Sequence, residues 1–220
     1  MSFLVNAEGG LTTAGYAVSI AAVVILLAAV FILLKKSSSS SKMTTQQIVV
    51  CAVAIALAYV CSYIQVFKLP FGGSVTLFSM LFIVLIGYWY GPKVGILTGL
   101  AYGILQFLQE PYVLNFVQVC CDYILAFAAL GIAGFFRNKK HGLIKGYIAG
   151  ILGRGLFHTI GGYLFWMSYM PENFPKSLSA VYPIVYNYSY ILAEGIITII
   201  VLCIPAVTKA LNQIKQTVVS

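Results

Sequence analysis

The stretch CCDYILAFAALGIAGFF, residues 120–136, decides the fold class of this chain. It is the C-terminal part of an apolar run from Tyr112 to Phe136, in which Asp122 is the single charged residue. A helix that crosses the roughly 30 Å hydrocarbon core of a bilayer needs about 20 mostly apolar residues. The run therefore predicts a membrane-spanning helix that carries a carboxylate.

The composition of the whole chain agrees with a membrane protein. Of its 220 residues, 61% are hydrophobic and 8% are charged, whereas a soluble domain carries roughly 25% charged residues. So few charges could not cover a water-facing surface, which excludes a soluble enzyme, a nucleic-acid binder and a disordered tail. The net charge of +8 is expected to mark the cytoplasmic side of a bilayer instead.

The apolar runs predict an all-α integral membrane fold with a six-helix core and an extra N-terminal helix. Gly, Pro and charged residues separate the six core stretches, which run over 46–66, 74–90, 94–108, 112–136, 143–169 and 181–211. The extra run, Leu11–Leu34, has no basic residue before it and ends in Lys35-Lys36. This is the reverse of a secretory signal. The expected parts are an anchor (1–36), a Ser-rich linker (37–42) and a membrane domain (43–220).

The distribution of basic residues predicts the topology. If the anchor ends inside, all 13 Lys and Arg residues except Lys68, Lys176 and Arg154 fall in cytoplasmic segments. Cytoplasmic loops of membrane proteins are enriched in these residues. We therefore expect a multi-pass protein of the bacterial plasma membrane, with both ends of the core in the cytoplasm and the anchor's N-terminus outside.

Four ionisable residues fall inside the predicted spans: Asp122, Arg154, His158 and Glu194. Such residues are costly in a membrane and are functional candidates by default. Two interpretations of Arg154 stay open, namely neutralisation of Asp122 or Glu194 and contact with a ligand. Glu194 lies near mid-membrane and is predicted to be structural.

Counting the helical rise of 1.5 Å per residue places polar groups from three helices at one depth. Asp122, His158, Tyr182 and Asn187 all fall in the outer half of the bilayer, while Tyr112 and Trp166 fall near the outer surface. Interfacial anchoring is the common role of single Tyr and Trp residues. An acid, an imidazole, an amide and rings at one level favour a pocket for a small, flat, partly cationic ligand.

Other motifs are few. The five cysteines lie in apolar spans without CxxC or Cys/His ligand spacing, so they are predicted to be buried hydrophobes with no metal or cofactor site. No P-loop, GxSxG or HExxH motif is present in the sequence, so any energy for transport must come from a partner or an ion gradient. Small residues four apart, Ala52 with Ala56 and Ala54 with Ala58, permit either packing within the bundle or docking to another membrane subunit.

Five sequence blocks, in order, resemble the thiamine-specific substrate-binding S components of energy-coupling factor (ECF) transporters, the ThiT/YuaJ family. The blocks are LPFGGSVTLFSM (69–80), YGPKVGILTGLAYG (90–103), CCDYILAFAALGIAGFF (120–136), GRGLFHTIGGYLFW (153–166) and VYPIVYNYSY (181–190). The resemblance runs from about Met43 to the C-terminus. It implies a thiamine-binding membrane subunit of a vitamin importer, which captures thiamine from outside and delivers it inward.

The resemblance also implies site residues and partners. The family's thiamine contacts fall on Asp122, Tyr123, His158, Trp166, Tyr182, Asn187, Tyr112 and Tyr102. Tyr102 stands where some members have a tryptophan, and Gly73 lies near the position of another. The implied partners are an ECF transmembrane coupling subunit, which docks on Ala52 and Ala56, and two ATPase subunits.

Other functions are weighed beside this one. The nearest alternative is an S component for another flat vitamin or a thiamine precursor. A stand-alone ion-coupled carrier would take up its substrate without ATP. A membrane-embedded enzyme could use Asp122, Arg154 and His158 as acid–base groups, but no nucleophile or metal constellation accompanies them, so the chain is not expected to be an enzyme.

Overall fold

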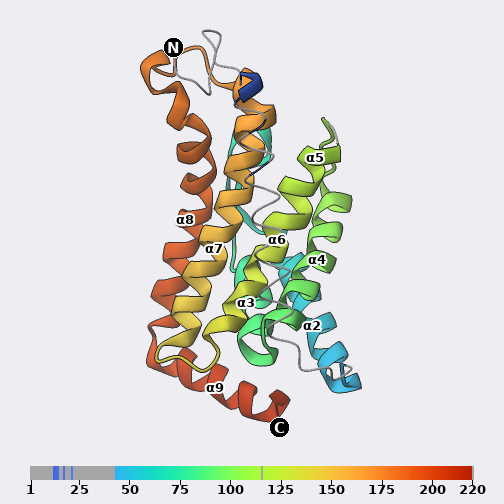
Figure 1. Cartoon of the computed structure of the whole chain (residues 1–220). Helices are drawn as coiled ribbons and strands as arrows, with labels where there is room; N and C mark the ends of the chain where they lie inside the picture. The colour runs from blue at the N-terminus through green and yellow to red at the C-terminus, as the bar shows by residue number, and fades with distance from the viewer. Residues whose placement is uncertain (1–11, 15–16, 18–20, 22–42, 115, 220) are drawn as a thin grey trace.

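The computed structural model describes residues 12–14, 17, 21, 43–114 and 116–219. The predicted anchor (1–36) and linker (37–42) fall almost entirely outside these residues, so the proposed domain boundaries stay predictions. The described core is a helical bundle with one small antiparallel sheet, and its helices run mostly side by side (Figure 1). The all-α prediction for the core is confirmed.

Six α-helices and one composite helix build the bundle within the described residues. The α-helices are α2 (Thr45–Ser62), α3 (Ser79–Tyr90), α4 (Pro92–Gln109), α7 (Gly142–Gly161), α8 (Tyr182–Leu202) and α9 (Pro205–Val219). The composite helix consists of α5 (Phe116–Val119), the π-helical η2 (Cys120–Leu125), α6 (Ala126–Ala128) and the 3-10 helix η3 (Ala129–Phe136). Helix α7 continues through the π-helical η4 (Gly162–Trp166) into the 3-10 turn η5 (Met167–Tyr169), and the 3-10 helix η6 (Lys176–Val181) precedes α8.

The sequence sets several of these helix ends locally. A capping box starts α2, because the Thr44 side chain accepts a hydrogen bond from Gln47 N and the Gln47 side chain accepts one from Thr44 N. Gly91 separates α3 from α4 with φ 97°, a conformation that glycine adopts without strain. Pro92 then opens α4 at a position where its missing N–H costs nothing.

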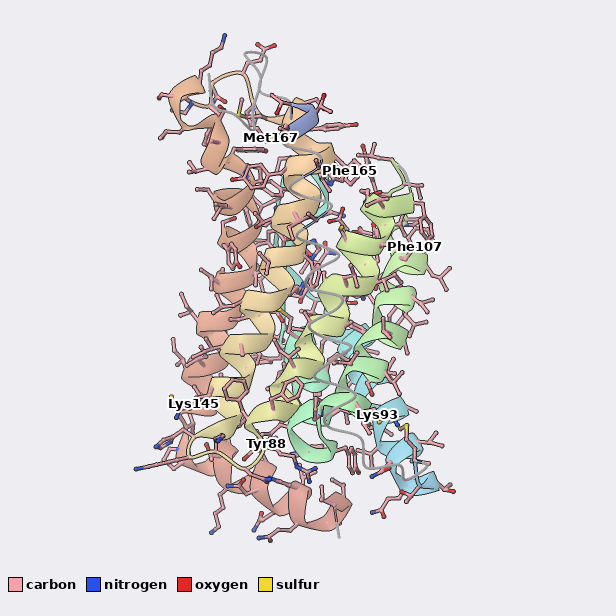
Figure 2. The ribbon with its side chains drawn as sticks, viewed as in Figure 1. Tyr88, Lys93, Phe107, Lys145, Phe165 and Met167 are labelled. Atoms are coloured by element: carbon pink, nitrogen blue, oxygen red, sulfur yellow. The ribbon has the colours of Figure 1, made fainter. Side chains whose placement is uncertain are left out.

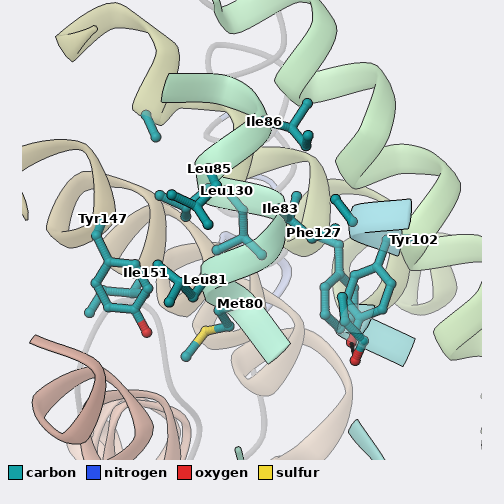
Figure 3. Close-up of a cluster of buried hydrophobic side chains, with 14 of the residues drawn as sticks. Met80, Leu81, Ile83, Leu85, Ile86, Tyr102, Phe127, Leu130, Tyr147 and Ile151 are labelled. Carbon is teal, nitrogen blue, oxygen red and sulfur yellow. Dashed lines mark hydrogen bonds between the residues drawn. The ribbon is translucent and has the colours of Figure 1, made fainter. Parts of the chain in front are cut away.

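Helix α3 lies in the middle of the bundle, in contact with α2, α4, α7 and η3. Its Met80, Ile83, Val84 and Ile86 side chains are fully buried, and Figure 3 shows this helix surrounded by apolar side chains from its neighbours. Lipid tails are as apolar as these residues, so close van der Waals packing contributes more here than the exclusion of water.

Glycines allow two of the helices to approach closely. Gly95 and Gly99 lie one turn apart on the side of α4 that contacts η3 and α6, and Gly131 lies opposite them. A Cβ atom at Gly131 would lie 2.2 Å from the backbone of Gly95, and one at Gly99 would lie 2.3 Å from the Phe127 carbonyl oxygen. The backbones therefore touch, as small residues permit in membrane helices.

The structure corrects two of the predicted spans. The span 74–90 begins as a strand: β1 (Gln65–Lys68) and β2 (Ser74–Thr76) form an antiparallel hairpin around the 3-10 turn η1 (Pro70–Gly72). The span 181–211 ends at Leu202, and a new helix, α9, begins at Pro205 and crosses the end of the bundle (Figure 1). Proline opens a helix well and continues one poorly, which explains this break.

Length and hydropathy mark three of the described helical segments as able to cross a membrane, namely Thr45–Ser62, Phe116–Phe136 and Lys176–Leu202. Ser79–Tyr90 is a shorter apolar helix. Figure 2 shows Lys93 and Lys145 at the end of the bundle that α9 crosses, whereas Phe165 and Met167 lie toward the opposite end.

The close contact of α4 with η3 gives a first prediction. Gly131→Ala should lower the free energy of unfolding by about 1–3 kcal/mol, because the new methyl group meets backbone atoms that cannot move aside. Thermal denaturation in detergent would measure this loss. Gly153→Ala on α7 is the matched control, since its Cβ would come no nearer than 3.1 Å to the Ala129 methyl group. Equal midpoints for both variants would contradict the packing described.

Candidate ligand-binding site

A cavity of about 560 Å³ lies between the β1–β2 hairpin, the C-terminal end of α4, η2, the end of α7 and the start of α8. It occupies the half of the bundle away from α9. Its polar and aromatic lining includes Ser62, Lys68, Gly73, Gln106, Gln109, Glu110, Tyr112, Gln118, Asp122, Tyr123, Phe127, Arg154, His158, Trp166, Tyr169, Tyr182, Tyr186, Asn187 and Tyr190.

Three side chains of this cavity converge on the carboxylate of Asp122. Gln118 Nε2 donates to Asp122 Oδ2 at 2.8 Å, and Trp166 Nε1 donates to the same oxygen at 3.2 Å. His158 Nδ1 lies 3.3 Å from Oδ1. The Asp122 side chain is still 13% exposed, so these donors fix its orientation and leave part of it facing the cavity.

Two π-helical segments position the polar groups around this carboxylate. Asp122 lies in η2, and Trp166 ends η4. Short π-helical insertions are frequent at functional sites because they shift the helix face that a side chain presents. Gly161 completes the approach, since a Cβ there would lie 2.8 Å from Asp122 Oδ1. Sequence periodicity alone does not reveal these π-helical turns.

Aromatic rings gather at one side of the carboxylate. The Trp166 ring centroid lies 4.8 Å from that of Tyr112 and 5.1 Å from that of Tyr169. The Tyr112 hydroxyl donates to the Tyr169 hydroxyl at 3.3 Å, and this hydrogen bond raises the pKa of Tyr112. Such a cluster offers flat faces to a flat or cationic ligand.

Helix α8 contributes a row of side chains to the cavity. Tyr182, Tyr186 and Tyr190 follow at intervals of four residues, with ring centroids 5.9 and 6.1 Å apart. Asn187 Nδ2 donates to the His158 carbonyl at 3.2 Å and to the Pro183 carbonyl at 2.8 Å, and Asn187 Oδ1 accepts from the Tyr190 hydroxyl. Asn187 thus ties α8 to α7 at the cavity wall.

The sequence interpretation missed Tyr186 and Tyr190. The four-residue spacing of these tyrosines could have revealed them, because residues four apart share one face of a helix and Tyr182 was already a candidate. Tyr186 also donates to the Pro70 carbonyl and accepts from Gly73 N at 3.4 Å. A Cβ at Gly73 would lie 2.8 Å from the Tyr190 ring. A larger residue at Gly73 would therefore displace this part of the wall.

A second group of polar side chains, also missed, lies where α2 meets α4. Gln106 Nε2 donates to Ser62 Oγ and to Gln109 Oε1, both at 3.0 Å, and Ser62 Oγ donates to Gln109 Oε1 at 2.9 Å. At the rim, Lys68 of β1 pairs with Glu110 at 2.5 Å. Amides at three-residue spacing in an apolar helix were the signal for this group.

Glu194, the second carboxylate within the bundle, has a different environment. It is 2% exposed and accepts from Thr76 N at 3.2 Å, Thr76 Oγ1 at 2.6 Å, Ser79 Oγ at 3.3 Å and Met80 N at 3.2 Å. These donors belong to β2 and the start of α3. Glu194 therefore joins α8 to the second strand of the hairpin and to the start of α3, which agrees with a structural role.

Arg154 contacts neither carboxylate directly. Among the residues that the structure describes, Lys68–Glu110 is the ion pair that a Lys or Arg side chain forms with a carboxylate, and the neighbour of Asp122 is the His158 imidazole. The Arg154 guanidinium carbon lies 4.5 Å from the centroid of the Phe127 ring, and its Nε donates to His158 Nε2 at 3.3 Å. The structure therefore does not support one of the two interpretations from sequence, in which Arg154 neutralises Asp122 or Glu194 directly.

Two of the predicted site residues do not contact the Asp122 carboxylate and have other roles. Tyr102 lies behind the cavity wall, fully buried, where its hydroxyl donates to the Ala58 carbonyl and its ring packs on Phe127. Tyr123 lines the cavity, but its hydroxyl donates to the Glu110 carbonyl at 2.8 Å and accepts from Tyr112 N. Tyr123 thus holds the rim of the cavity in place.

The two alanine faces of α2 differ in burial. Ala54 and Ala58 are buried in the bundle, with 7% and 0% exposure, whereas Ala52 and Ala56 are exposed. Packing within the bundle thus accounts for one pair.

The described residues contain no group of three or more His, Cys, Asp or Glu side chains that could hold a metal ion.

A carboxylate, an imidazole and several aromatic rings around one cavity of a helical membrane bundle are features of a membrane protein with a small-molecule site. The family model for the thiamine transporter protein (Thia_YuaJ) matches residues 48–214. The chain therefore belongs to the thiamine transporter family, which is a family of transport proteins and not of enzymes.

Known proteins support the same family. The chain is 35% identical to the thiamine transporter ThiT of Bacillus subtilis (strain 168) over 156 residues, which cover 62% of this chain and 77% of that protein. It is also similar to the solved structure of ThiT from Listeria monocytogenes, with a TM-score of 0.57 and 26% identity. That match covers 73% of this chain and 96% of the other.

Proposed function

We propose that this chain is the thiamine-binding S component of an ECF-type importer, which captures thiamine from outside the cell and delivers it inward. The observation that carries the proposal is the Asp122 carboxylate, which His158 and Trp166 orient toward a ring-lined cavity. Family membership supports thiamine as the ligand.

Thiamine has the chemistry that this cavity would recognise. It combines an aminopyrimidine, which carries N–H donors, with a positively charged thiazolium ring. A carboxylate accepts hydrogen bonds from the amine and attracts the cation, while the rings of Trp166 and Tyr112 offer faces for stacking and cation–π contact. The polar side chains of Ser62, Gln106 and Gln109, which also line the cavity, would face the polar tail of the ligand.

The energy for transport would come from a partner complex. We infer that the exposed Ala52 and Ala56 face of α2 docks on the ECF transmembrane coupling subunit, which carries two ATPase subunits. Exposure of this pair and burial of Ala54 and Ala58 support the assignment. Small residues permit the close helix–helix approach that such docking needs.

The orientation in the membrane follows from charge. We propose that the end crossed by α9 faces the cytoplasm, because Lys93 and Lys145 lie there (Figure 2) and basic residues favour the cytoplasmic side. The cavity, which lies in the opposite half, would then open to the outside. Both ends of the described core, α2 and α9, would be cytoplasmic, and an N-terminal anchor would place its own N-terminus outside.

A thiamine titration followed by tryptophan fluorescence tests the ligand. We expect thiamine to quench the fluorescence of the protein purified in detergent and Trp166→Phe to remove most of this signal. Trp89, the other tryptophan, is buried in the core away from the cavity. Trp89→Phe is therefore the control variant. Riboflavin and biotin are the competitor ligands, and tight binding of either one without binding of thiamine would refute the assignment.

The two carboxylates should separate affinity from stability. Asp122→Asn removes the charge that faces the cavity, and we expect it to weaken thiamine binding by more than about tenfold. Glu194→Gln should leave the affinity unchanged and lower the thermal stability, because an amide nitrogen would then face N–H and O–H donors. Isothermal titration and thermal denaturation measure the two properties. Equal losses of affinity in both variants would contradict the division of roles.

The docking face has its own test. Ala56→Trp should leave thiamine binding intact and abolish uptake in cells, because the bulky ring would hold the coupling subunit away from α2. Leu97→Trp on α4, at another exposed position, is the matched control and should leave uptake unchanged. Normal uptake by the Ala56 variant would disprove the docking role.

A further inference from the structure

A hydrogen bond joins Arg154 and His158 on α7. Arg154 lies one turn before His158 on α7, and its Nε donates to His158 Nε2 at 3.3 Å. A guanidinium has N–H donors and no acceptor. His158 Nε2 must therefore supply the lone pair in this bond, so it carries no proton.

The other ring nitrogen must then carry the proton. His158 Nδ1 lies 3.3 Å from Asp122 Oδ1, where an N–H donates to the carboxylate. In this arrangement the imidazole is neutral and accepts a hydrogen bond from a cation on one side. A second proton on Nε2 would break the bond with Arg154 and place an imidazolium against a guanidinium.

The remaining neighbours of the imidazole do not supply a competing charge. The Tyr190 ring of α8 lies 6.2 Å away in an edge-on arrangement, and its hydroxyl donates to Asn187 Oδ1. Among residues 43–114 and 116–219, the charged and titratable groups that face the His158 ring are thus Asp122 of η2, Arg154 of α7 and Tyr190 of α8. Of these, Asp122 would favour an imidazolium and Arg154 opposes it.

We propose that Arg154 is a positioning residue, which keeps His158 neutral with its proton on Nδ1 and so preserves the negative charge of Asp122 for a cationic ligand. An imidazolium at His158 would form an ion pair with Asp122 and cancel the charge that attracts the cation. The role of the ligand in this inference rests on the proposed function, whereas the state of the imidazole does not.

Nitrogen NMR on the ligand-free protein tests the state of the imidazole directly. The chain has two histidines, and His141→Asn leaves one signal to observe, at a position with φ 54° that asparagine tolerates. With nitrogen-15-labelled histidine, we expect the shifts of a neutral ring protonated on Nδ1 throughout about pH 6 to about pH 8. An imidazolium, or a ring protonated on Nε2, would overturn the proposal whether or not thiamine binds.

The pH profile of thiamine affinity tests the consequence. The wild-type affinity should be constant between about pH 6 and about pH 8, whereas in Arg154→Met it should fall by about tenfold as the pH drops, because His158 can now become charged beside Asp122. Lys145→Met, an exposed site on the same helix, is the matched control and should follow the wild type. A constant affinity in Arg154→Met would overturn the proposal.

A second variant covers the case in which Arg154→Met does not fold. Arg154→Gln keeps an N–H donor that can reach toward His158 Nε2 without the charge, so its affinity should fall less at low pH than that of the methionine variant. A fall as large as that predicted for the methionine variant would show that charge alone, and not the hydrogen bond, sets the state of the imidazole, and would overturn the positioning role. Failure of the wild type to bind thiamine would refute the proposed function and leave the NMR result to decide the state of His158.

Discussion

A carboxylate inside a membrane bundle needs donors around it, because a charged side chain at the centre of a membrane helix costs about 3 kcal/mol or more. For Asp122 these donors come from Gln118 on its own helical segment and from His158 and Trp166 on the neighbouring α7–η4 segment. Both segments have π-helical turns where these side chains meet, and a glycine, Gly161, lies where the Asp122 carboxylate approaches α7. The cavity forms around this one group.

The two carboxylates of the bundle differ in how fully they are bonded. A carboxylate has about four acceptor positions, and Glu194 uses four hydrogen bonds from β2 and the start of α3 while it is 2% exposed. Asp122 has three donors and is 13% exposed at the cavity wall. Glu194 is therefore saturated, and Asp122 retains capacity for a ligand. The same distinction separates a group that holds the fold from one that can bind.

Hydropathy and helical rise predicted much of the fold and part of the site. They located the helices of the core, and they placed Asp122, His158 and Asn187 near one depth, because depth depends only on position along a helix. They missed the β1–β2 hairpin and the break before α9, since short strands and a single proline barely change the hydropathy. The amides of α4 and the contact of Arg154 with the Phe127 ring were missed, because they depend on which sides of two helices pack together, and one sequence does not specify this.

If Asp122 anchors the ligand, an experimental structure of the protein with thiamine bound should show that contact. We expect the aminopyrimidine within hydrogen-bond distance of the Asp122 carboxylate, a ring face of thiamine against Trp166, and His158 still bonded to Arg154. Thiamine bound among Ser62, Gln106 and Gln109 with no contact to Asp122 would refute the role of this carboxylate.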